Sequence, residues 1–194
     1  MAVQIVDGLI EPELAAECRQ WLLNQNLVFG WKAHAKAPGV FWHRNFVLPG
    51  KHNHHYDAGA WQPERTFDAF VAQGGPLARV ALRVKDQFFP NAEITRLWVN
   101  VQAFGDEASL HRDFPTEFQY TARSVIWYPV AEWSEDWGGD LVVLDDLGEI
   151  KAAAMVKPNR MVQINGCMRH AARPISRYCN ALRIAVAFGS EVAP

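Results

Sequence analysis

Cysteines and long hydrophobic runs are scarce in this sequence, and each scarcity argues against a class of protein. Only three cysteines occur, Cys18, Cys167 and Cys179, and they are far apart, odd in number and without a CxxC spacing. That pattern argues against a disulfide framework and against a zinc knuckle. No apolar run approaches the roughly 18 residues of a membrane span, and the first residues lack the features of a signal peptide. We therefore expect a cytoplasmic protein that does not interact with membranes.

An excess of charge of one sign is also missing. The chain has 19 Lys and Arg against 21 Asp and Glu, a formal net charge of −2, and its basic residues do not form a cluster. A nucleic-acid-binding surface depends on such a cluster of positive charge. We therefore expect no nucleic-acid partner.

What is present is the composition of one soluble globular domain. The chain has 194 residues, of which 49% are hydrophobic and 21% are charged, and this suffices for one full core. The spacing of the apolar residues divides this single domain, residues 1–194, into a helix-containing part over 1–93 and a β core over 94–189. A monomer and a homodimer are both compatible with these features.

Three helices are expected before the β core. After Glu11-Pro12-Glu13, apolar residues recur at positions 14, 18, 21 and 22, which is one helical stripe behind a proline and acidic residues. Two further helices are predicted over 63–73 and 77–88. Short strands before the helices and after them favour a mainly β fold of barrel or jelly-roll type with helical cover. These strands are predicted over 3–6, 41–47, 94–104, 122–130, 141–144, 152–156, 160–164 and 183–188.

The stretch Leu110-His111-Arg112-Asp113-Phe114 carries a pair of metal-ligand candidates. In an extended segment, side chains two positions apart project from the same face, so that His111 and Asp113 can be offered together. His170, which follows an apolar run and precedes a proline-containing turn, is the best-placed third ligand. Two imidazoles and one carboxylate form the facial triad that holds non-haem Fe(II) and leaves positions open.

Further features follow the H-x-D motif in a fixed order. These features are Arg123-Ser124-Val125-Ile126-Trp127-Tyr128, Trp133 through Gly138-Gly139-Asp140-Leu141, Lys157-Pro158-Asn159-Arg160-Met161-Val162-Gln163-Ile164, His170 and Leu182-Arg183-Ile184-Ala185-Val186-Ala187-Phe188. With these features in this order, the chain resembles the 2-oxoglutarate-dependent Fe(II) oxygenases, in particular their prolyl-4-hydroxylase-like branch, over roughly residues 94 to 189. The resemblance implies a double-stranded β-helix, or jelly roll, with N-terminal helices packed on the major sheet. It also implies Fe(II), 2-oxoglutarate and O₂, with His111, Asp113 and His170 as metal ligands.

The far carboxylate of 2-oxoglutarate needs a partner, because a buried unpaired charge is costly. An arginine can take a carboxylate with two parallel hydrogen bonds and stays charged. Arg183 leads the last strand, at the position of the family's basic anchor, with Arg173 and Arg177 as rivals. Tyr128 matches a family position that often gives a hydroxyl to the same carboxylate. Asn100, on the polar side of the strand over 94–104, is expected to line the same cavity.

The substrate contacts are predicted elsewhere in the chain. The segment over 29–63 has no clear period and is expected to supply substrate-facing loops, because binding loops vary on a fixed scaffold. His43 and Arg44 lie among aromatic residues on the strand over 41–47, and Gln102 lies two residues after Asn100. We predict these three as substrate contacts. His34, His52, His54 and His55 crowd the same segment and are interpreted as loop residues rather than as a metal site.

The expected activity is hydroxylation of an unactivated C–H bond in an amino acid or a small biosynthetic intermediate, with succinate and CO₂ as co-products. A peptidyl-prolyl hydroxylase is the alternative within the same family. Three other classes could use similar residues: a jelly-roll metal dioxygenase or isomerase that does not use 2-oxoglutarate, a zinc hydrolase, and an inert binding module. The zinc hydrolase gives no role to a buried Arg183, and the inert module would have lost ligands that this sequence keeps.

Overall fold

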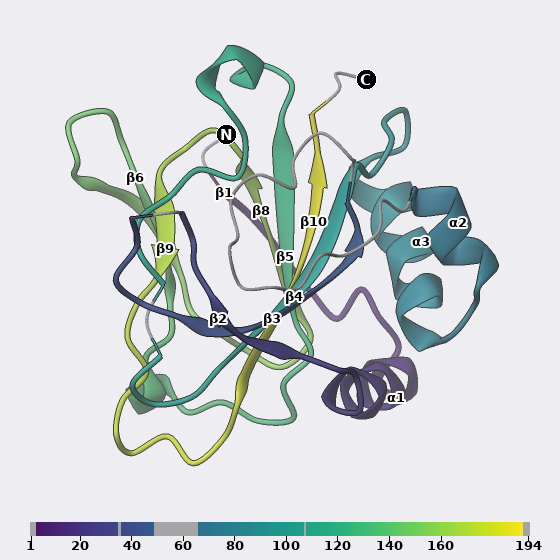
Figure 1. Ribbon diagram of the computed structural model, residues 1–194, viewed down its shortest axis with the longest axis horizontal. Helices are drawn as coiled ribbons and strands as arrows, with labels where there is room; N and C mark the ends of the chain where they lie inside the picture. Colours follow the sequence, from purple (N-terminus) through teal and green to yellow (C-terminus); the bar gives the residue numbers. More distant parts are fainter. Residues whose placement is uncertain (1–2, 35, 49–65, 107, 192–194) are drawn as a thin grey trace.

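Two antiparallel β-sheets form the centre of the molecule. The computed structural model describes residues 3–34, 36–48, 66–106 and 108–191. A seven-stranded sheet has the order β1-β8-β5-β10-β4-β3-β2, and a three-stranded sheet has the order β7-β6-β9 (Figure 1). The strands of the two sheets are β1 Val3–Asp7, β2 Val28–Trp31, β3 Phe41–Val47, β4 Arg96–Gln102, β5 Arg123–Tyr128, β6 Leu141–Leu144, β7 Ile150–Ala154, β8 Arg160–Asn165, β9 His170–Ala172 and β10 Arg183–Ser190. The prediction of a mainly β chain with a few helices is therefore confirmed.

Most strands lie where the apolar pattern predicts them, and the differences have local causes. β4 is shorter at both ends than the predicted 94–104, and β7 begins two residues before the predicted 152–156. β2 was not predicted, because a register shift between Phe29 and Trp31 and the positive φ of Gly30, 104°, hide its alternation. β9 was also not predicted, since three residues are too few to show a period.

The helices lie together on one side of the large sheet (Figure 1). α1 spans Pro12–Leu23 and begins at its proline, as predicted, with Cys18 and Leu22 buried. α3 spans Pro76–Phe88, and α2 spans Phe67–Ala72, while residues 63–65 of the predicted helix lie outside the described residues. The ring of Phe46 on β3 lies 5.5 Å from Trp21 of α1 and 5.9 Å from Phe70 of α2. Aromatic packing therefore joins two of the helices to the sheet.

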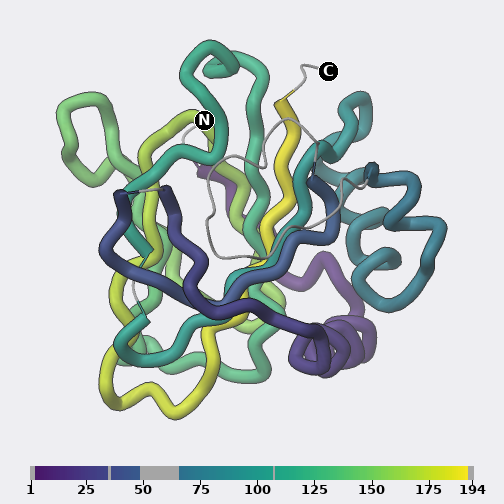
Figure 2. Tube along the Cα trace, in the orientation of Figure 1, coloured from purple at the N-terminus to yellow at the C-terminus, as the bar shows by residue number. Residues whose placement is uncertain are grey.

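The path of the chain places the last strand in the middle of the large sheet. β10 pairs with β4 on one side and with β5 on the other, so that Arg183 lies opposite Gln102. β1 starts, and β10 ends, at the same end of this sheet (Figure 2). Among the described residues, no helix is long and apolar enough to cross a membrane.

Candidate functional site

Two backbone hydrogen bonds place His111 and His170 side by side. The amide of His111 donates to the carbonyl of His170 over 3.0 Å, and the amide of His170 donates to the carbonyl of His111 over 2.9 Å. His170 begins β9, whereas His111 lies in the segment after β4. The ligand atoms of His111, Asp113 and His170 all lie within 4.8 Å of one another. The structure thus gathers the three predicted metal ligands, which come from distant parts of the sequence.

Each imidazole is oriented by the backbone carbonyl two residues before it. Nδ1 of His111 lies 2.9 Å from the Ser109 carbonyl, and Nδ1 of His170 lies 2.9 Å from the Met168 carbonyl. A carbonyl can only accept a hydrogen bond, so each Nδ1 carries a proton, and in the neutral ring each Nε2 keeps its lone pair. Both Nε2 atoms face Asp113, at 3.4 Å from Oδ1 and 3.6 Å from Oδ2. This tautomer is the one that imidazole ligands need, because a bonded Nδ1 leaves Nε2 for the metal.

Asp113 is buried and held by three groups. The hydroxyl of Ser124 on β5 donates to Oδ2 over 2.6 Å, and Arg96 Nη1 donates to the Asp113 carbonyl over 2.5 Å. The Asp113 amide donates to the carbonyl of Gly166 over 2.9 Å. At Gly166, a Cβ atom would lie 2.5 Å from a ring carbon of Phe114 and 2.8 Å from Ser124 Oγ. Only a glycine therefore lets the backbone come this close to Ser124 and to the carboxylate.

The charges of the triad support metal binding. Burial alone would raise the pKa of Asp113, but the charge of His170 and the hydrogen bond and charge of His111 hold it below its ordinary value. Burial lowers the pKa of His170. For His111, burial opposes protonation, but the hydrogen bond and charge of Asp113 raise its pKa. An ionised carboxylate and imidazole lone pairs directed at one point are the donor set of a divalent metal such as Fe(II).

A small inner cavity of about 50 Å³ leads from the triad to a buried arginine. Residues of both sheets line it, among them Asn100, His170 and Arg183. Arg183 is only 3% exposed. Its Nε donates to the Gly139 carbonyl over 2.8 Å, Nη1 to Gln102 Oε1 over 2.8 Å, and Nη2 to the Tyr128 hydroxyl over 3.3 Å.

No carboxylate pairs with Arg183 in the described part of the chain, so a buried guanidinium faces the cavity without a counter-ion. Burial raises the pKa of Tyr128, although Arg183 opposes the shift, so the phenol keeps its proton for donation. The rival arginines Arg173 and Arg177 are exposed and do not line this cavity. Arg183 and Asn100 thus line one cavity with the triad, and the Tyr128 hydroxyl lies within hydrogen-bond distance of Arg183.

A larger cleft of about 480 Å³ also borders the triad, through His111 and Asp113. His43 and Asn100 line it together with Trp31, whose ring stacks on His43 at 3.6 Å and 6°. His43 Nδ1 lies 2.6 Å from Asn100 Oδ1, and burial lowers the pKa of His43 to about 3. The neutral ring therefore donates from Nδ1 to Asn100 and keeps an acceptor at Nε2. Within the described residues, this buried Nε2 has no hydrogen-bond partner.

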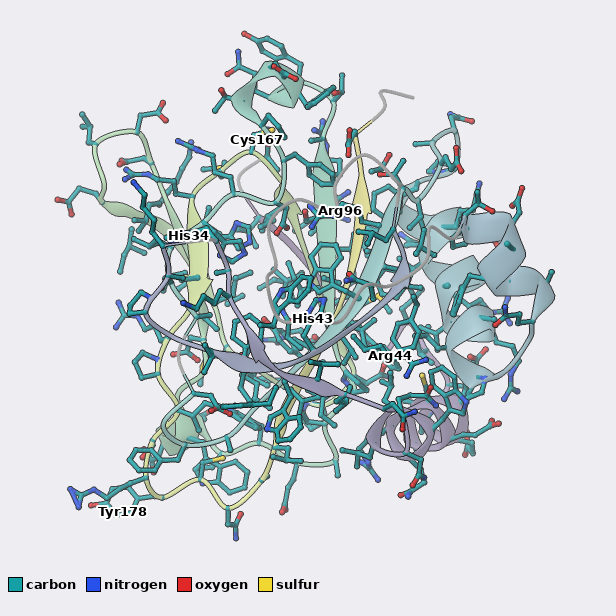
Figure 3. All side chains as sticks on the ribbon, in the orientation of Figure 1. His34, His43, Arg44, Arg96, Cys167 and Tyr178 are labelled. Carbon is teal, nitrogen blue, oxygen red and sulfur yellow. The ribbon has the colours of Figure 1, made fainter. Side chains whose placement is uncertain are left out.

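The other predicted substrate contacts lie outside this cleft. Arg44 projects to the opposite face of β3, where it donates to the Asn26 carbonyl over 3.1 Å and lies 5.6 Å from the Phe46 ring. Figure 3 shows the labelled His43 near the centre of the molecule and Arg44 toward α1. Gln102 bonds to Arg183 in the inner cavity. His34 lines the cleft, whereas His52, His54 and His55 lie outside the described residues.

Two residues that hold the triad were not among those predicted from the sequence. Ser124 lies near the start of β5, directly before the apolar residues Val125 to Trp127, and is completely buried, so a hydroxyl at the start of an apolar run was the available signal. Arg96 precedes the apolar stretch of β4 and had no such signal, because a charged residue at a strand end is usually a surface residue.

No family model matches the chain, and no curated protein matches it in sequence. Solved structures do match it, at low sequence identity. An oxidoreductase of the 2OG-Fe(II) oxygenase family from Burkholderia pseudomallei has a TM-score of 0.64 and 15% identity, over 99% of this chain and 88% of that chain. A prolyl-4-hydroxylase from Pseudomonas putida has a TM-score of 0.59 and 15% identity, over 97% and 91%.

HygX from Streptomyces hygroscopicus, with nickel and 2-oxoglutarate bound, has a TM-score of 0.61 and 13% identity, over 97% of this chain and 82% of that chain. These structures resemble the present one over nearly its whole length, and their names agree with the chemistry that the His111, Asp113 and His170 site supports. The chain therefore has the fold of structures that are 2-oxoglutarate- and Fe(II)-dependent oxygenases.

Proposed function

We propose that this protein is a 2-oxoglutarate-dependent Fe(II) oxygenase that hydroxylates an unactivated C–H bond of an amino acid or a small biosynthetic intermediate. The observation that carries the proposal is the buried Arg183, which has no counter-ion among the described residues and lies at the end of a cavity that begins at the metal triad. A buried cation without a counter-ion costs free energy, even when it donates hydrogen bonds to neutral groups. A dicarboxylate that reaches from the triad to Arg183 would supply one.

The proposal gives the polar residues around the inner cavity their roles. His111, Asp113 and His170 would hold Fe(II). Bound Fe(II) supplies the activation of O₂ that couples oxidative decarboxylation of 2-oxoglutarate to hydroxylation of the substrate. Arg183 and the hydroxyl of Tyr128 bind the far carboxylate, and Asn100 lines the path to it.

Gln102 takes a different role from the predicted substrate contact. Its amide oxygen accepts a hydrogen bond from Arg183 Nη1, so we propose it as a positioning residue for the arginine. His43 stays a proposed substrate contact, because it lines the cleft and its Nε2 is an unused acceptor. Arg44 is not carried further, since it lies on the opposite face of β3.

The proposed fold is a double-stranded β-helix, formed as a single domain over residues 1–194 with the helices packed on the major sheet. Residues of both sheets line the inner cavity, as expected for two sheets that face each other across a metal site. Aromatic contacts of α1 and α2 with Phe46 support the helix placement.

A small substrate agrees with the size of the cleft, because small-molecule pockets have volumes of about 300 to 1,000 Å³ and this one has about 480 Å³. Similar structures include both substrate types: one HygX structure contains hygromycin B, and a prolyl hydroxylase from Trichoplax adhaerens is in complex with a peptide fragment. The zinc hydrolase and the inert binding module would leave Arg183 without a function, and the metal dioxygenase or isomerase would leave it without a ligand.

Turnover of 2-oxoglutarate tests the proposal directly. The purified protein, Fe(II), 2-oxoglutarate and air are combined with a panel of free amino acids and, separately, with proline-containing peptides, and succinate is measured. We expect succinate production that His111→Ala abolishes and that one of the free amino acids stimulates. Stimulation by the peptides alone would replace the small-molecule substrate with a peptidyl one. Succinate production no higher than in His111→Ala under all conditions would overturn the proposal.

A further inference from the structure

The cleft on the substrate side of the triad contains a surplus of positive charge. Among the described residues, Lys36, Arg96 and Arg112 line it, together with the two carboxylates of Asp113 and Glu191. Asp113 belongs to the proposed metal site, and its charge is used there. In the described part of the chain, no carboxylate lies within ion-pair distance of any of the three basic residues. The cleft therefore offers positive charge that no carboxylate of the described residues pairs with.

Arg96 is the most constrained of these three cations. Its guanidinium lies 4.8 Å from the centroid of the Trp98 ring and 5.5 Å from that of Phe114. These two aromatic contacts restrict the position of the Arg96 guanidinium. Lys36 and Arg112, by contrast, are exposed to solvent. Because Nη1 donates to the carbonyl of Asp113 over 2.5 Å, the arginine is also fixed at the edge of the triad.

Within the part of the chain that the structure describes, one edge of the Arg96 guanidinium makes no hydrogen bond. Its Nε is buried without a hydrogen bond, and among the described residues Nη2 also makes none. The Nε and Nη2 protons of an arginine are parallel and match the two oxygens of a carboxylate. An arginine that is partly buried, held by rings and unpaired on this edge is suited to an anionic ligand.

The rest of the cleft fits the apolar body of such a ligand. Trp31, Phe41, Trp98 and Phe114 line it, and aromatic walls bind flat apolar groups well. His43 adds a neutral ring stacked on Trp31, which brings no further charge. The cleft thus has a positive charge at Arg96 and aromatic surface along its walls. A ligand that matches both is an acid with a flat or apolar body.

We propose that the substrate of this cleft is a small carboxylic acid with an apolar body, and that Arg96 binds its carboxylate. The inference rests on the proposed function, since the cleft is the substrate side of the same metal site. It narrows the substrate class from small molecules in general to carboxylic acids. It also gives the two arginines different roles: Arg183 binds the carboxylate of the co-substrate, and Arg96 binds the carboxylate of the substrate.

Matched acids and amides test the inference. The protein is loaded anaerobically with Fe(II) and saturating 2-oxoglutarate, so that Arg183 is occupied, and binding of phenylacetate and indole-3-acetate is compared by calorimetry with that of phenylacetamide and indole-3-acetamide. We expect each acid to bind at least about ten-fold more tightly than its amide, as charge-assisted hydrogen bonds do. Equal binding of acid and amide, or binding of neither, would overturn the inference.

Variants assign the preference to Arg96. Arg96→Gln should abolish the difference between acid and amide, and Arg96→Lys should keep only part of it. Arg123→Gln is the matched control, because Arg123 is also half-buried and donates to backbone carbonyls but lines neither cavity of the site. A disturbed triad would weaken acid and amide equally, so the ratio reports the carboxylate contact. An unchanged ratio in Arg96→Gln would overturn the role of Arg96.

The same samples separate this inference from the proposed function. The visible absorption band of the Fe(II) and 2-oxoglutarate complex is recorded before each titration. If the band forms and acids show no preference, only the carboxylate inference fails. If the band does not form, the proposed function fails, and the comparison of acid with amide still decides the charge preference of the cleft.

Discussion

Ser124 Oγ donates a hydrogen bond to Asp113 Oδ2 over 2.6 Å, and both side chains are buried beside the two imidazoles. The hydroxyl orients the carboxylate and leaves Oδ1 directed toward His111. Residues that orient a ligand in this way affect metal affinity almost as strongly as the ligand itself. Ser124 is thus connected to the proposed metal site through Asp113.

Replacement of Ser124 by alanine should weaken binding of Fe(II), or of Co(II) as a spectroscopic substitute, by about 10- to 100-fold. The reason is that Asp113 loses the donor that fixes its orientation. Anaerobic metal titration measures the effect, and Ser134→Ala, at the exposed cap of a short helix, is the control. Metal affinity equal to that of the wild type would show that the backbone alone positions Asp113.

Gln102→Leu should weaken binding of 2-oxoglutarate and leave binding of the substrate unchanged. Leucine has a similar size but cannot accept the hydrogen bond that Arg183 Nη1 donates to Gln102. A lost hydrogen bond to a charged group costs about 1.5 to 3 kcal/mol, or roughly 10- to 100-fold in affinity. The loss of affinity is measured from the dependence of succinate production on the 2-oxoglutarate concentration. A change in substrate affinity alone would favour the substrate contact predicted from the sequence.

Gly139→Ala tests how closely the backbone must approach Arg183. A Cβ at Gly139 would lie 3.0 Å from Arg183 Cδ and 3.2 Å from the Trp133 ring, so the arginine must move. Gly105→Ala is the control, because Gly105 also has a positive φ, 92° against 74°, but open space around it. Both variants should lose about 1 to 2 kcal/mol of stability from backbone strain. Only Gly139→Ala should also weaken 2-oxoglutarate binding, and equal 2-oxoglutarate affinity in the two variants would contradict this account.

The ion pair between Asp7 and Arg160 joins β1 to β8 and should make stability depend on pH. Arg160 donates from Nε and Nη2 to the two oxygens of Asp7, each over 2.7 Å, and this hydrogen bonding lowers the pKa of Asp7. A carboxyl group with a lowered pKa stabilises the fold above its unfolded pKa of about 3.9, and that stability disappears as the pH falls through the folded value.

Asp7→Asn should therefore reduce the free energy of unfolding at pH 7 by about 0.5 to 1 kcal/mol, a small effect because the carboxylate is half-exposed. The difference from the wild type should shrink as the pH falls below about 4. Urea denaturation of both proteins at pH 7 and below pH 4 measures this difference in the free energy of unfolding. A difference that grows at low pH would have the wrong sign for this mechanism.

The sequence predicted the triad better than its surroundings, for a physical reason. His111 and Asp113 are two residues apart, and such spacing fixes the relative direction of two side chains in an extended segment. The face that a strand turns toward the site is not fixed in this way. His43 and Arg44 are neighbours on β3, both were predicted as substrate contacts, and the pairing of β3 with β4 turns only His43 to the cleft.

Contacts between residues on different strands could not be predicted from the sequence. Gln102 lies opposite Arg183 only because β10 pairs with β4 in one register, and Ser124 reaches Asp113 only because Gly166 lets two segments approach. Both contacts join residues that no local pattern connects. By contrast, the apolar period predicted the strands over 41–47 and 141–144 with the bounds that the structure shows.

The most direct measurement of the central claim is the visible spectrum of the anaerobic protein after addition of Fe(II) and then 2-oxoglutarate. We expect the weak metal-to-ligand charge-transfer band of a chelated keto acid, absent in His111→Ala and requiring far more 2-oxoglutarate in Arg183→Ala. Iron binding without this band would contradict the 2-oxoglutarate assignment, and the site would then be that of a metal dioxygenase or isomerase that works without the co-substrate.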